Sequence, residues 1–586
     1  MEKIKFTLLL ILLLGLSLSA QTVNIKIVET SDVHGSLLPY DFKNAKEKNY
    51  SLAQVSQYVK ELRADVNQEV ILVDNGDILQ GTPLIYYYNY ERPDQKNIYS
   101  QIMNYMKYDA GTVGNHDIET GHKVYDKFNS ELNFPWLAAN ARDTEKDKPY
   151  FQPYTIIKRK GIKIAVLGLI TPGIPMWLPE VLWSGIDFQD MKKSAGKWVK
   201  IIKEKENPDM IVGVFHSGID HTYGGQAAKL HRNENASQIV AEEVDGFDLI
   251  FVGHDHKRWN FTVKNKSGKD VLILGPLASA QTVSQANITF TYNPQTGEWD
   301  KKIKGEIVEM FDRKPDPEYL EKFDYARIAT NKYVNKPVGK FLSEITTREA
   351  ILGPSAFMDV IHSFQIEQAD ADISLAAPLA FDSKVKKGEI FVRDMFNLYK
   401  YENFLYTMKL SGKEIKDFLE YSYASWMAQA KDKNDHLMLF EKDKEGNLKK
   451  SDRSGAPLLK ARFYNFSSAS GINYTVDITK PTGEKINITA LTNGEKFDLS
   501  KTYKVAINSY RGNGGGGHLT KGAKIDKDQL ADRLITSTDK DLRFYLMKWI
   551  EKKGIVEPEI KGNWKVIPED LYKELKAKDY KLIFRK

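Results

Sequence analysis

The stretch IVETSDVHG, residues 27–35, is an apolar run that ends on two residues of metal-binding type, Asp32 and His34. Four later stretches repeat this pattern, each with Asp, Asn or His after its apolar run: VILVDNGD (70–77), GTVGNHD (111–117), IVGVFHSG (211–218) and LIFVGHDH (249–256). Apolar runs of this length are typical of buried parallel strands. Their polar tails then lie at the carboxyl ends of the strands, where open α/β sheets bind ligands.

Seven side chains in these tails are predicted metal ligands: Asp32, His34, Asp77, Asn115, His216, His254 and His256. Each has an ordinary alternative, since a lone His is often a hydrogen-bonded structural residue and an Asp at a strand end often caps a helix. Seven such residues in succession, each after an apolar run, are hard to explain by structural roles alone, because buried Asp and His cost free energy without a compensating partner. Two cations supply that partner.

The types of ligand narrow the choice of metal. Carboxylate, amide and imidazole groups without sulfur suit zinc, manganese, cobalt, nickel or iron. We therefore expect two divalent metal ions, Zn, Mn or similar, about 3.5–4 Å apart and bridged by a shared carboxylate. Asp77 is the natural bridge, and Asn115 adds a neutral oxygen that keeps the site from repelling a phosphate. Many phosphatases bind a phosphoryl group with such a pair of metals.

Composition excludes several other functions. The chain has no cysteine, which rules out disulfides, a thiolate zinc site and a catalytic Cys. Its formal charge of +6, from 84 basic and 78 acidic residues, mildly favours anionic small molecules. A nucleic-acid polymer would require a clustered basic face, so we do not expect one as a partner.

The first twenty residues have the pattern of a secretory signal peptide. Lys3 and Lys5 precede the apolar run FTLLLILLLGLSLSA, and the small residues Ser19 and Ala20 end it. The alternative is a retained N-terminal anchor. We expect a monomeric protein exported across the inner membrane to the periplasm, without stable membrane insertion.

The length of 586 residues predicts two or more domains. Residues 21–312 alternate apolar strands with amphipathic helical stretches, which indicates a layered α/β domain. Residues 313–339 are predicted to form one long linker helix, with Asp316 as its N-cap and Pro317 at its first position. Residues 340–586 mix helices and strands in a second domain with its own core.

The motifs DVHG, GD, GNHD, FHSG and GHDH together resemble those of the calcineurin-like metallophosphoesterases. With a large C-terminal domain, the resemblance narrows to the secreted 5′-nucleotidase and cyclic-nucleotide phosphodiesterase family. It implies an N-terminal four-layer α/β/β/α domain and a C-terminal α+β substrate-binding domain. It also implies that one metal is held by Asp32, His34, Asp77 and His256, and the other by Asp77, Asn115, His216 and His254.

The resemblance implies catalytic roles for two further residues. His116 would face the substrate phosphate and stabilise or protonate the leaving oxygen. Glu119, three residues later, would hydrogen-bond the imidazole, fix its tautomer and raise its pKa. The alternative for Glu119 is a surface residue at a helix start. A metal-activated water would attack phosphorus in line.

The resemblance also implies a nucleotide substrate whose base is held in the C-terminal domain. In the family, one aromatic ring comes from each of two segments, which here are RFYNFSSASGINYTVD (462–477) and INSYRGNGGGG (507–517). Tyr510 matches the second ring, and Tyr464 or Phe466 the first, with core packing as the alternative for each. Stacking on one ring contributes about 1–3 kcal/mol per base.

The glycine tract GNGGGG, residues 512–517, follows the second ring. Four consecutive glycines form either a plain flexible loop or a place where a ligand approaches the backbone closely. Beside a base-binding ring, Gly514 and Gly515 would lie against the sugar or base.

Three stretches favour one branch of the family. GDILQGTPL (76–84), YENFLYTMKLSGKEIKDFLEYS (401–422) and YNFSSASGINYTVDITKP (464–481) resemble the periplasmic 2′,3′-cyclic-nucleotide 2′-phosphodiesterase/3′-nucleotidases. The 5′-nucleotidases tend to carry phosphate-binding arginines where this chain has SLAAPLAFDSKVKKG (374–388), which contains none. We therefore expect a cyclic phosphodiesterase with 3′-nucleotidase activity. The alternatives are a 5′-nucleotidase or UDP-sugar hydrolase and, in another class, a catalytically silent nucleotide-binding protein.

Overall fold

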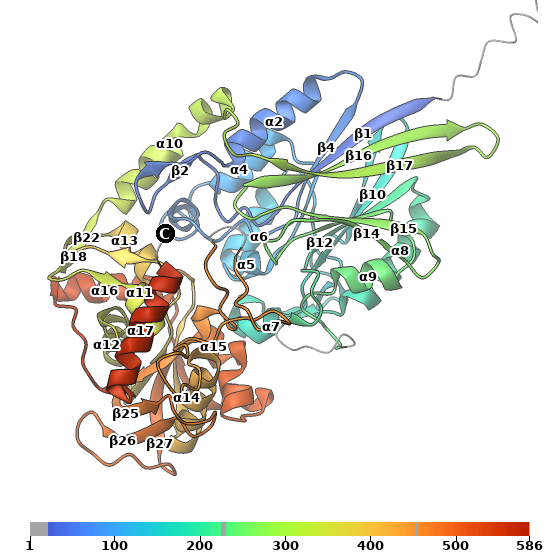
Figure 1. Cartoon of the computed structure of the whole chain (residues 1–586). Helices are drawn as coiled ribbons and strands as arrows, with labels where there is room; N and C mark the ends of the chain where they lie inside the picture. The colour runs from blue at the N-terminus through green and yellow to red at the C-terminus, as the bar shows by residue number, and fades with distance from the viewer. Residues whose placement is uncertain (1–20, 224–229, 452–454, 585–586) are drawn as a thin grey trace, which may run out of the picture. The chain divides into compact units, whose positions relative to one another are not determined.

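The computed structural model describes residues 21–223, 230–451 and 455–584 (Figure 1). The predicted signal peptide lies outside the described residues. The chain separates into two compact units. Unit 1 holds Met1–Tyr40, Glu47–Gly173 and Ser184–Asp324, and unit 2 holds Asp41–Lys46, Ile174–Trp183 and Tyr325–Lys586.

Unit 1 is built on two six-stranded sheets (Figure 1). The first has the order β17 (Glu298–Glu309), β16 (Thr282–Asn293), β1 (Thr22–Thr30), β4 (Glu69–Asp74), β5 (Ala110–Thr112) and β6 (Trp136–Leu137). The second has the order β14 (Trp259–Lys264), β15 (Asp270–Gly275), β13 (Leu249–Val252), β12 (Met210–His216), β10 (Ile162–Ile170) and β9 (Tyr154–Arg159). The apolar runs of the five motifs lie in β1, β4 and β5 of the first sheet and β12 and β13 of the second.

The strands that carry the motifs are parallel, as predicted. β1 pairs with β4 and β4 with β5, while β12 pairs with β13, all in parallel register. Parallel strands point their carboxyl ends to the same edge of a sheet. The polar tails in each sheet are therefore delivered to one edge.

Side chains from both sheets share one apolar core. Ile25 and Ile71 of the first sheet join Ile164 and Val212 of the second in a single buried cluster. A separate cluster packs α8 (Met191–Glu206) and α9 (Ser237–Glu243) on the other face of the second sheet. The helix α2 (Leu52–Ala64) packs on β4 of the first sheet and buries Leu52, Val55 and Val59. These layers confirm the α/β/β/α arrangement.

The predicted long helix is α10, Pro317–Val334. Asp316 caps it, because its Oδ1 accepts hydrogen bonds from the backbone N–H groups of Glu318 at 3.1 Å and Tyr319 at 3.3 Å. The two compact units divide inside this helix, between Asp324 and Tyr325. The predicted domain boundaries at 312 and 339 stay predictions.

Unit 2 mixes sheets and helices around its own core, which confirms the predicted α+β character. Its largest sheet has the order β24 (Ser468–Ser470), β20 (Ile373–Ala376), β27 (Thr502–Asn508), β23 (Leu405–Ser411) and β28 (Leu534–Ser537). Smaller sheets have the orders β22 (Gly388–Phe391), β18 (Pro337–Phe341), β29 (Ile555–Val556) and β26 (Ile486–Leu491), β25 (Ile472–Asp477), β30 (Trp564–Ile567). The principal helices are α12 (Ala356–Ala369), α14 (Gly412–Trp426), α16 (Leu542–Lys553) and α17 (Glu569–Phe584).

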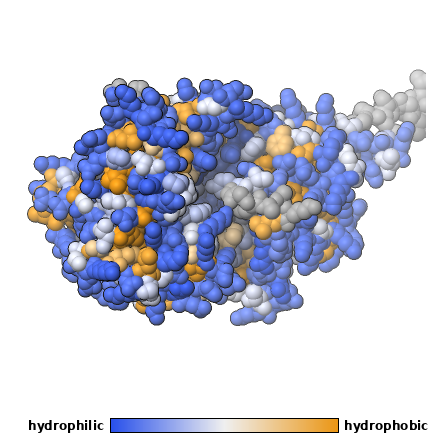
Figure 2. Space-filling view, turned by 60° about the horizontal axis from the view of Figure 1, so that its bottom comes forward, coloured by the Kyte–Doolittle hydropathy of each residue, from blue (hydrophilic) through white to orange (hydrophobic). Residues whose placement is uncertain are grey.

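The part of the chain that the structure describes contains no candidate membrane-spanning helix. No helix there combines the length and apolarity needed to cross a bilayer. The face seen in Figure 2 is mostly hydrophilic, with smaller hydrophobic areas among the polar residues.

Candidate metal centre

The seven predicted metal ligands all lie at the ends of strands in unit 1. Their placement follows the chain: Asp32 and His34 after β1, Asp77 after β4, Asn115 after β5, His216 at the end of β12, and His254 and His256 after β13. Ligands more than 200 residues apart, such as His34 after β1 and His256 after β13, come from different sheets and meet because the two sheets pack on one shared core.

The ligands form two groups that share one carboxylate. Asp32, His34, Asp77 and His256 each offer a ligand atom within 4.8 Å of the others, and so do Asp77, His216 and His254. Asn115 completes the second group, since its Oδ1 lies 2.8 Å from His254 Nδ1 and 3.1 Å from His216 Nε2. All seven predicted residues are therefore brought together, with Asp77 in the bridging position.

The arrangement fits two divalent cations. Imidazole nitrogens converge, with His34 Nε2 in hydrogen-bond contact with His256 Nε2 at 3.1 Å. His216 Nε2 lies 3.1 Å from Asp77 Oδ2, and His256 Nε2 lies 3.2 Å from Asp32 Oδ1. Oxygen and imidazole donors that point at two common centres are the ligand chemistry of zinc, manganese and similar ions.

The backbone at the ligands is strained. Five of the seven have left-handed φ angles: Asp32 50°, His34 46°, Asp77 57°, His254 73° and His256 58°. Residues other than glycine adopt this conformation at a cost of about 1–3 kcal/mol each, and they cluster at functional sites.

A buried carboxylate that the motifs did not single out holds two of the ligand loops together. Asp117 accepts backbone hydrogen bonds from Asp77 at 3.0 Å, Ile78 at 2.8 Å, Leu79 at 2.9 Å and Gly114 at 2.7 Å. It thereby ties the loop of the bridging Asp77 to the loop that presents Asn115. Burial and the charge of Asp77 raise the pKa of Asp117 to about 6, against the effect of these N–H groups.

The surroundings keep two of the ligands, Asp77 and His34, in their binding forms. Burial alone raises the pKa of Asp77, but positive charge on His216 and His116 holds it well below its ordinary value. Burial and the nearby His256 lower the pKa of His34 to about 3, so this imidazole is neutral at neutral pH. An ionised carboxylate and a neutral imidazole are the forms that coordinate a metal.

The centre is open on one side. The side chain of His256 is 46% exposed, whereas those of Asp32 and Asp77 are 1% exposed. A substrate can therefore reach the ligands from the side of His256. Closed structural metal sites have no such opening.

His116 and Glu119 form the pair expected from the sequence. The carboxylate of Glu119 contacts Nδ1 of His116, and Glu119 is 6% exposed rather than on the surface. The backbone N–H of His116 donates to Asp77 Oδ1 at 2.8 Å, and its ring lies 5.4 Å from that of His34. Burial lowers the pKa of His116, but Asp77 and Glu119 outweigh it and raise the pKa to about 9. The imidazole therefore carries a proton at neutral pH.

In unit 2, the two aromatic segments predicted to hold the base, here called the clamp segments, are linked by one buried guanidinium. Arg511, 4% exposed, donates from Nη2 to the Tyr464 carbonyl at 2.9 Å and from Nη1 to the Gly515 carbonyl at 2.6 Å. The guanidinium also lies 5.5 Å from the ring centre of Tyr510. Tyr464 and Tyr510 are both half-buried, so the structure places them in neighbouring, partly accessible segments.

Phe466 is a core residue, and its assignment to the clamp is wrong. The side chain is 1% exposed and stacks on Trp426, with ring centres 5.3 Å apart and planes at 3°. The face of a buried, stacked ring is already covered, so no base can lie on it. Aromatic character alone did not distinguish Phe466 from Tyr464, two residues earlier.

The glycine tract has a defined conformation. Gly514, Gly516 and Gly517 have φ angles of 96°, 68° and 76°, which favour glycine. A Cβ atom on Gly515 would lie 2.6 Å from Cε2 of the Tyr510 ring. The tract thus packs directly against the predicted clamp ring, and Gly515 is the position where the contact is tightest.

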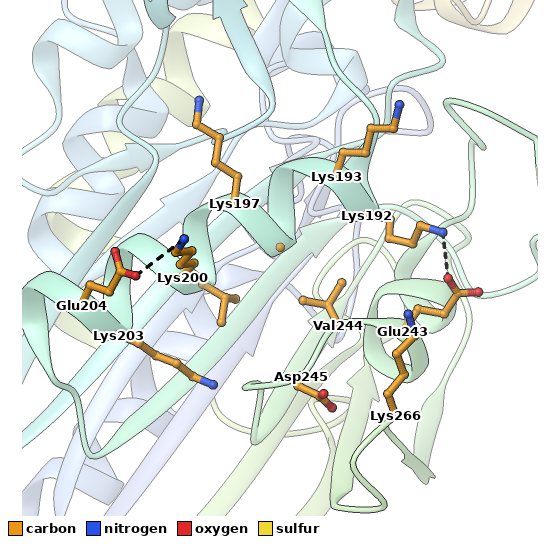
Figure 3. Close-up of a pocket in the computed structure, with 12 residues that line it drawn as sticks. Lys192, Lys193, Lys197, Lys200, Lys203, Glu204, Glu243, Val244, Asp245 and Lys266 are labelled. Atoms are coloured by element: carbon orange, nitrogen blue, oxygen red, sulfur yellow. Dashed lines mark hydrogen bonds and ion pairs between the residues drawn. The ribbon is translucent and has the colours of Figure 1, made fainter.

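A separate cavity on unit 1 does not belong to the metal centre. It has a volume of about 610 Å³ and is lined by side chains of α8 and its neighbours, as Figure 3 shows: Lys192, Lys193, Lys197, Lys200, Lys203 and Lys266. Lys192 pairs with Glu243 at 2.7 Å. The lining includes none of the seven predicted ligands. The candidate site is therefore identified by the chemistry of its ligand atoms and not by the size of a cavity.

Comparison with known families agrees with this geometry. The calcineurin-like phosphoesterase family matches residues 25–258, which contain all seven ligands. The 5′-nucleotidase C-terminal domain matches residues 334–522, which contain both clamp segments. The chain thus combines a calcineurin-like phosphoesterase domain with a 5′-nucleotidase C-terminal domain. It is therefore a metal-dependent phosphoester hydrolase.

Relatives resemble this phosphoesterase along nearly its whole length. It is 27% identical to the 2′,3′-cyclic-nucleotide 2′-phosphodiesterase/3′-nucleotidase of Salmonella typhimurium, over 96% of this chain and 91% of that protein. It is 26% identical to the trifunctional nucleotide phosphoesterase YfkN of Bacillus subtilis, over 94% of this chain but only 39% of that protein. A solved 5′-nucleotidase precursor from Thermus thermophilus shares the fold, with a TM-score of 0.62 and 21% identity, over 93% of this chain and 100% of that one.

Proposed function

We propose that this protein hydrolyses 2′,3′-cyclic nucleotides to 3′-nucleotides, and 3′-nucleotides to nucleoside and phosphate. The observation that carries the proposal is the seven-residue centre with shared Asp77, set beside the protonated His116. The Salmonella relative, which is matched over nearly its full length, bears the name of this activity. Three stretches that resemble this branch of the family support the same choice of substrate.

The metal ions would be held by Asp32, His34, Asp77 and His256 on one side, and by Asp77, Asn115, His216 and His254 on the other. When bound, they supply a nucleophilic water and offset negative charge that develops on the phosphoryl oxygens. Asp77, which is common to both groups, would keep the two positions close together. The strained ligand backbone and Asp117 hold the donors in place before substrate arrives.

His116 is proposed to act on the leaving oxygen. In the first reaction, water attacks phosphorus and the bond from phosphorus to O2′ breaks. In the second, the bond from phosphorus to O3′ breaks. Each departing oxygen needs a proton, and the carboxylate of Glu119 against Nδ1 of His116 favours the protonated imidazole that can donate it. Glu119 occupies Nδ1, which leaves Nε2 to donate.

The base is proposed to stack on Tyr510 and Tyr464 in unit 2. Both rings are half-buried and thus have area left for a ligand. Arg511 fixes the two segments to each other before a nucleotide binds. Stacking of this kind tolerates different bases, because every base has a π face.

The test is an activity assay on the purified, metal-loaded protein. Initial rates are measured with 2′,3′-cAMP, 3′-AMP and 5′-AMP at matched concentrations. We expect the first two to be hydrolysed faster than 5′-AMP. A clear preference for 5′-AMP contradicts the proposal and favours a 5′-nucleotidase. Absence of turnover on all three, with metal bound, favours a nucleotide-binding protein.

A further inference from the structure

His254 uses its two ring nitrogens for different partners. Nδ1 lies 2.8 Å from Asn115 Oδ1, inside the second ligand group. Nε2 lies 3.0 Å from Oε1 of Glu234, on the opposite side of the ring. Glu234 belongs to neither ligand group. A carboxylate at Nε2 favours the tautomer with its proton on Nε2, and this leaves the Nδ1 lone pair facing the metal position.

Two other ligand histidines, His216 and His34, contact a neutral backbone carbonyl through Nδ1. His216 Nδ1 lies 2.6 Å from the Asn75 carbonyl, and His34 Nδ1 lies 3.2 Å from the Gln80 carbonyl. Within residues 21–223, 230–451 and 455–584, Glu234 is the one carboxylate outside the ligand groups that contacts a ligand histidine. An ionised acceptor increases the basicity of the ring more than a carbonyl does.

Glu234 is held firmly enough to set the orientation of the ring. Its side chain is 14% exposed. Its carbonyl accepts hydrogen bonds from Thr171 Oγ1 at 3.0 Å and from Ser217 Oγ at 2.8 Å. Ser217 directly follows the ligand His216, so Glu234 is fixed to the same part of the chain that carries the other imidazole of the group.

The residues on either side of Glu234 strengthen this attachment. Asn233 and Asn235 are 3% and 4% exposed. The Asn235 backbone N–H donates to Asn233 Oδ1 at 2.9 Å, and Asn235 Oδ1 accepts from the Gly218 N–H at 3.2 Å. The segment therefore has a fixed path beside the metal centre, and the carboxylate of Glu234 is aimed at His254.

We propose that Glu234 is a positioning residue that sets the affinity of the second metal position by orienting His254. The proposal rests on the two-metal centre of the proposed function. Carboxylates behind metal-binding histidines typically change metal affinity 10–100-fold when removed. The first position, formed by Asp32, His34, Asp77 and His256, does not include His254 and should keep its affinity.

The test compares Glu234→Gln and Glu234→Ala with the wild type, using Mn²⁺ alone as the probe. Calorimetric titration gives both affinities, and elemental analysis after dialysis gives the number of ions retained. We expect Glu234→Ala to weaken one of two Mn²⁺ sites about 10–100-fold and leave the other unchanged. Glu234→Gln keeps an oxygen acceptor, so it should recover part of the loss. Glu243→Ala, an exposed glutamate on α9, is the matched control and should bind two ions normally.

The possible results separate this proposal from the proposed function. Two unchanged affinities in Glu234→Ala, in a protein whose wild type binds two ions, overturn the role of Glu234 alone. Equal weakening of both sites also overturns it, because the effect is then not specific to His254. A wild type that binds fewer than two ions overturns the two-metal centre itself. If Glu234→Ala does not fold, Glu234→Gln decides, and a wild-type affinity at both sites then counts against the proposal.

Discussion

Replacement of Gly515 by alanine should damage nucleotide recognition without touching the metal centre. An ideal Cβ atom at this position lies 2.6 Å from Cε2 and 2.7 Å from Cζ of the Tyr510 ring, and 2.6 Å from the Tyr510 carbonyl oxygen. Carbon atoms in contact normally lie about 3.5–4.0 Å apart, so the ring or the backbone must move by roughly 1 Å. Overpacking of this kind costs about 1–3 kcal/mol.

The expected kinetic effect follows from stacking. If the Tyr510 ring leaves its position, the base loses about 1–3 kcal/mol of stacking, and a tenfold change in an equilibrium constant corresponds to about 1.4 kcal/mol. The KM for 3′-AMP should therefore rise between about 5-fold and 150-fold. Hydrolysis of glycerol 2-phosphate, which has no base, should keep its kcat/KM because the metal ligands are unchanged.

The assay is a pair of Michaelis–Menten curves for the two substrates, with a thermal unfolding curve to confirm the fold. Gly196→Ala on α8 is the matched control, since no atom lies within 4 Å of its ideal Cβ and alanine favours a helix. It should leave both substrates unaffected. An unchanged KM for 3′-AMP in Gly515→Ala would refute the assignment of Tyr510 to the base. Equal losses on both substrates would show that the damage is not confined to base binding.

Three further predictions concern the two sites. Glu119→Gln should lower kcat for 3′-AMP about 10–100-fold with metal content unchanged, because His116 loses the charge that helps to raise its pKa; an unchanged kcat from acid to alkaline pH would contradict this. Burial lowers the pKa of His216, but Asp77 raises it to about 10, so the metal-free ring is protonated at neutral pH. Mn²⁺ must displace that proton, so affinity should rise with pH and fall as the ring is protonated; titrations in two buffers of different ionisation enthalpy measure the proton released, and a pH-independent affinity would contradict the assignment. Tyr510→Phe should keep the KM for 3′-AMP within about twofold, whereas Tyr510→Ala should raise it about 5-fold to 150-fold; equal effects would show that the hydroxyl, not the ring, matters.

The residues of the candidate metal centre could be predicted because each lies directly after an apolar run that the sequence shows. An apolar run such as VILV in residues 70–73 identifies a buried strand, and the polar residue that follows must lie at its carboxyl end. The long helix could also be predicted, since Asp316 and Pro317 mark its first turn. In both cases, the information needed lies within a few residues of the feature.

Asp117 and Glu234 were missed because their roles depend on distant contacts. Asp117 binds the backbone of Asp77, 40 residues earlier, and Glu234 contacts His254, 20 residues later. Asp117 ends the motif GTVGNHD, but nothing in that motif marks it as an acceptor for backbone N–H groups, and Glu234 follows no apolar run. The pattern Asn-Glu-Asn at 233–235 gives no hint of a metal centre, and only the structure shows that Asn233 and Asn235 are buried and that Glu234 lies half-buried beside His254.

The error at Phe466 has a similar origin. Within FYNF, residues 463–466, the sequence offers three rings and does not say which of them faces the core. The short helical turn at Phe463–Asn465 directs Phe466 onto Trp426, 40 residues earlier, and leaves Tyr464 partly accessible. The left-handed backbone at Asp32, His34 and Asp77 was also beyond prediction, because Asp and His adopt this conformation more readily than most residues but the sequence does not say which of them do so.

The central claim is that this chain builds a two-metal centre bridged by Asp77. Anomalous diffraction from crystals grown with Mn²⁺ tests it directly. We expect two peaks in unit 1, about 3.5–4 Å apart, with Asp77 bound to both, His34 and His256 at one, and His216 and His254 at the other. A single peak, or two peaks without Asp77 between them, would contradict the account.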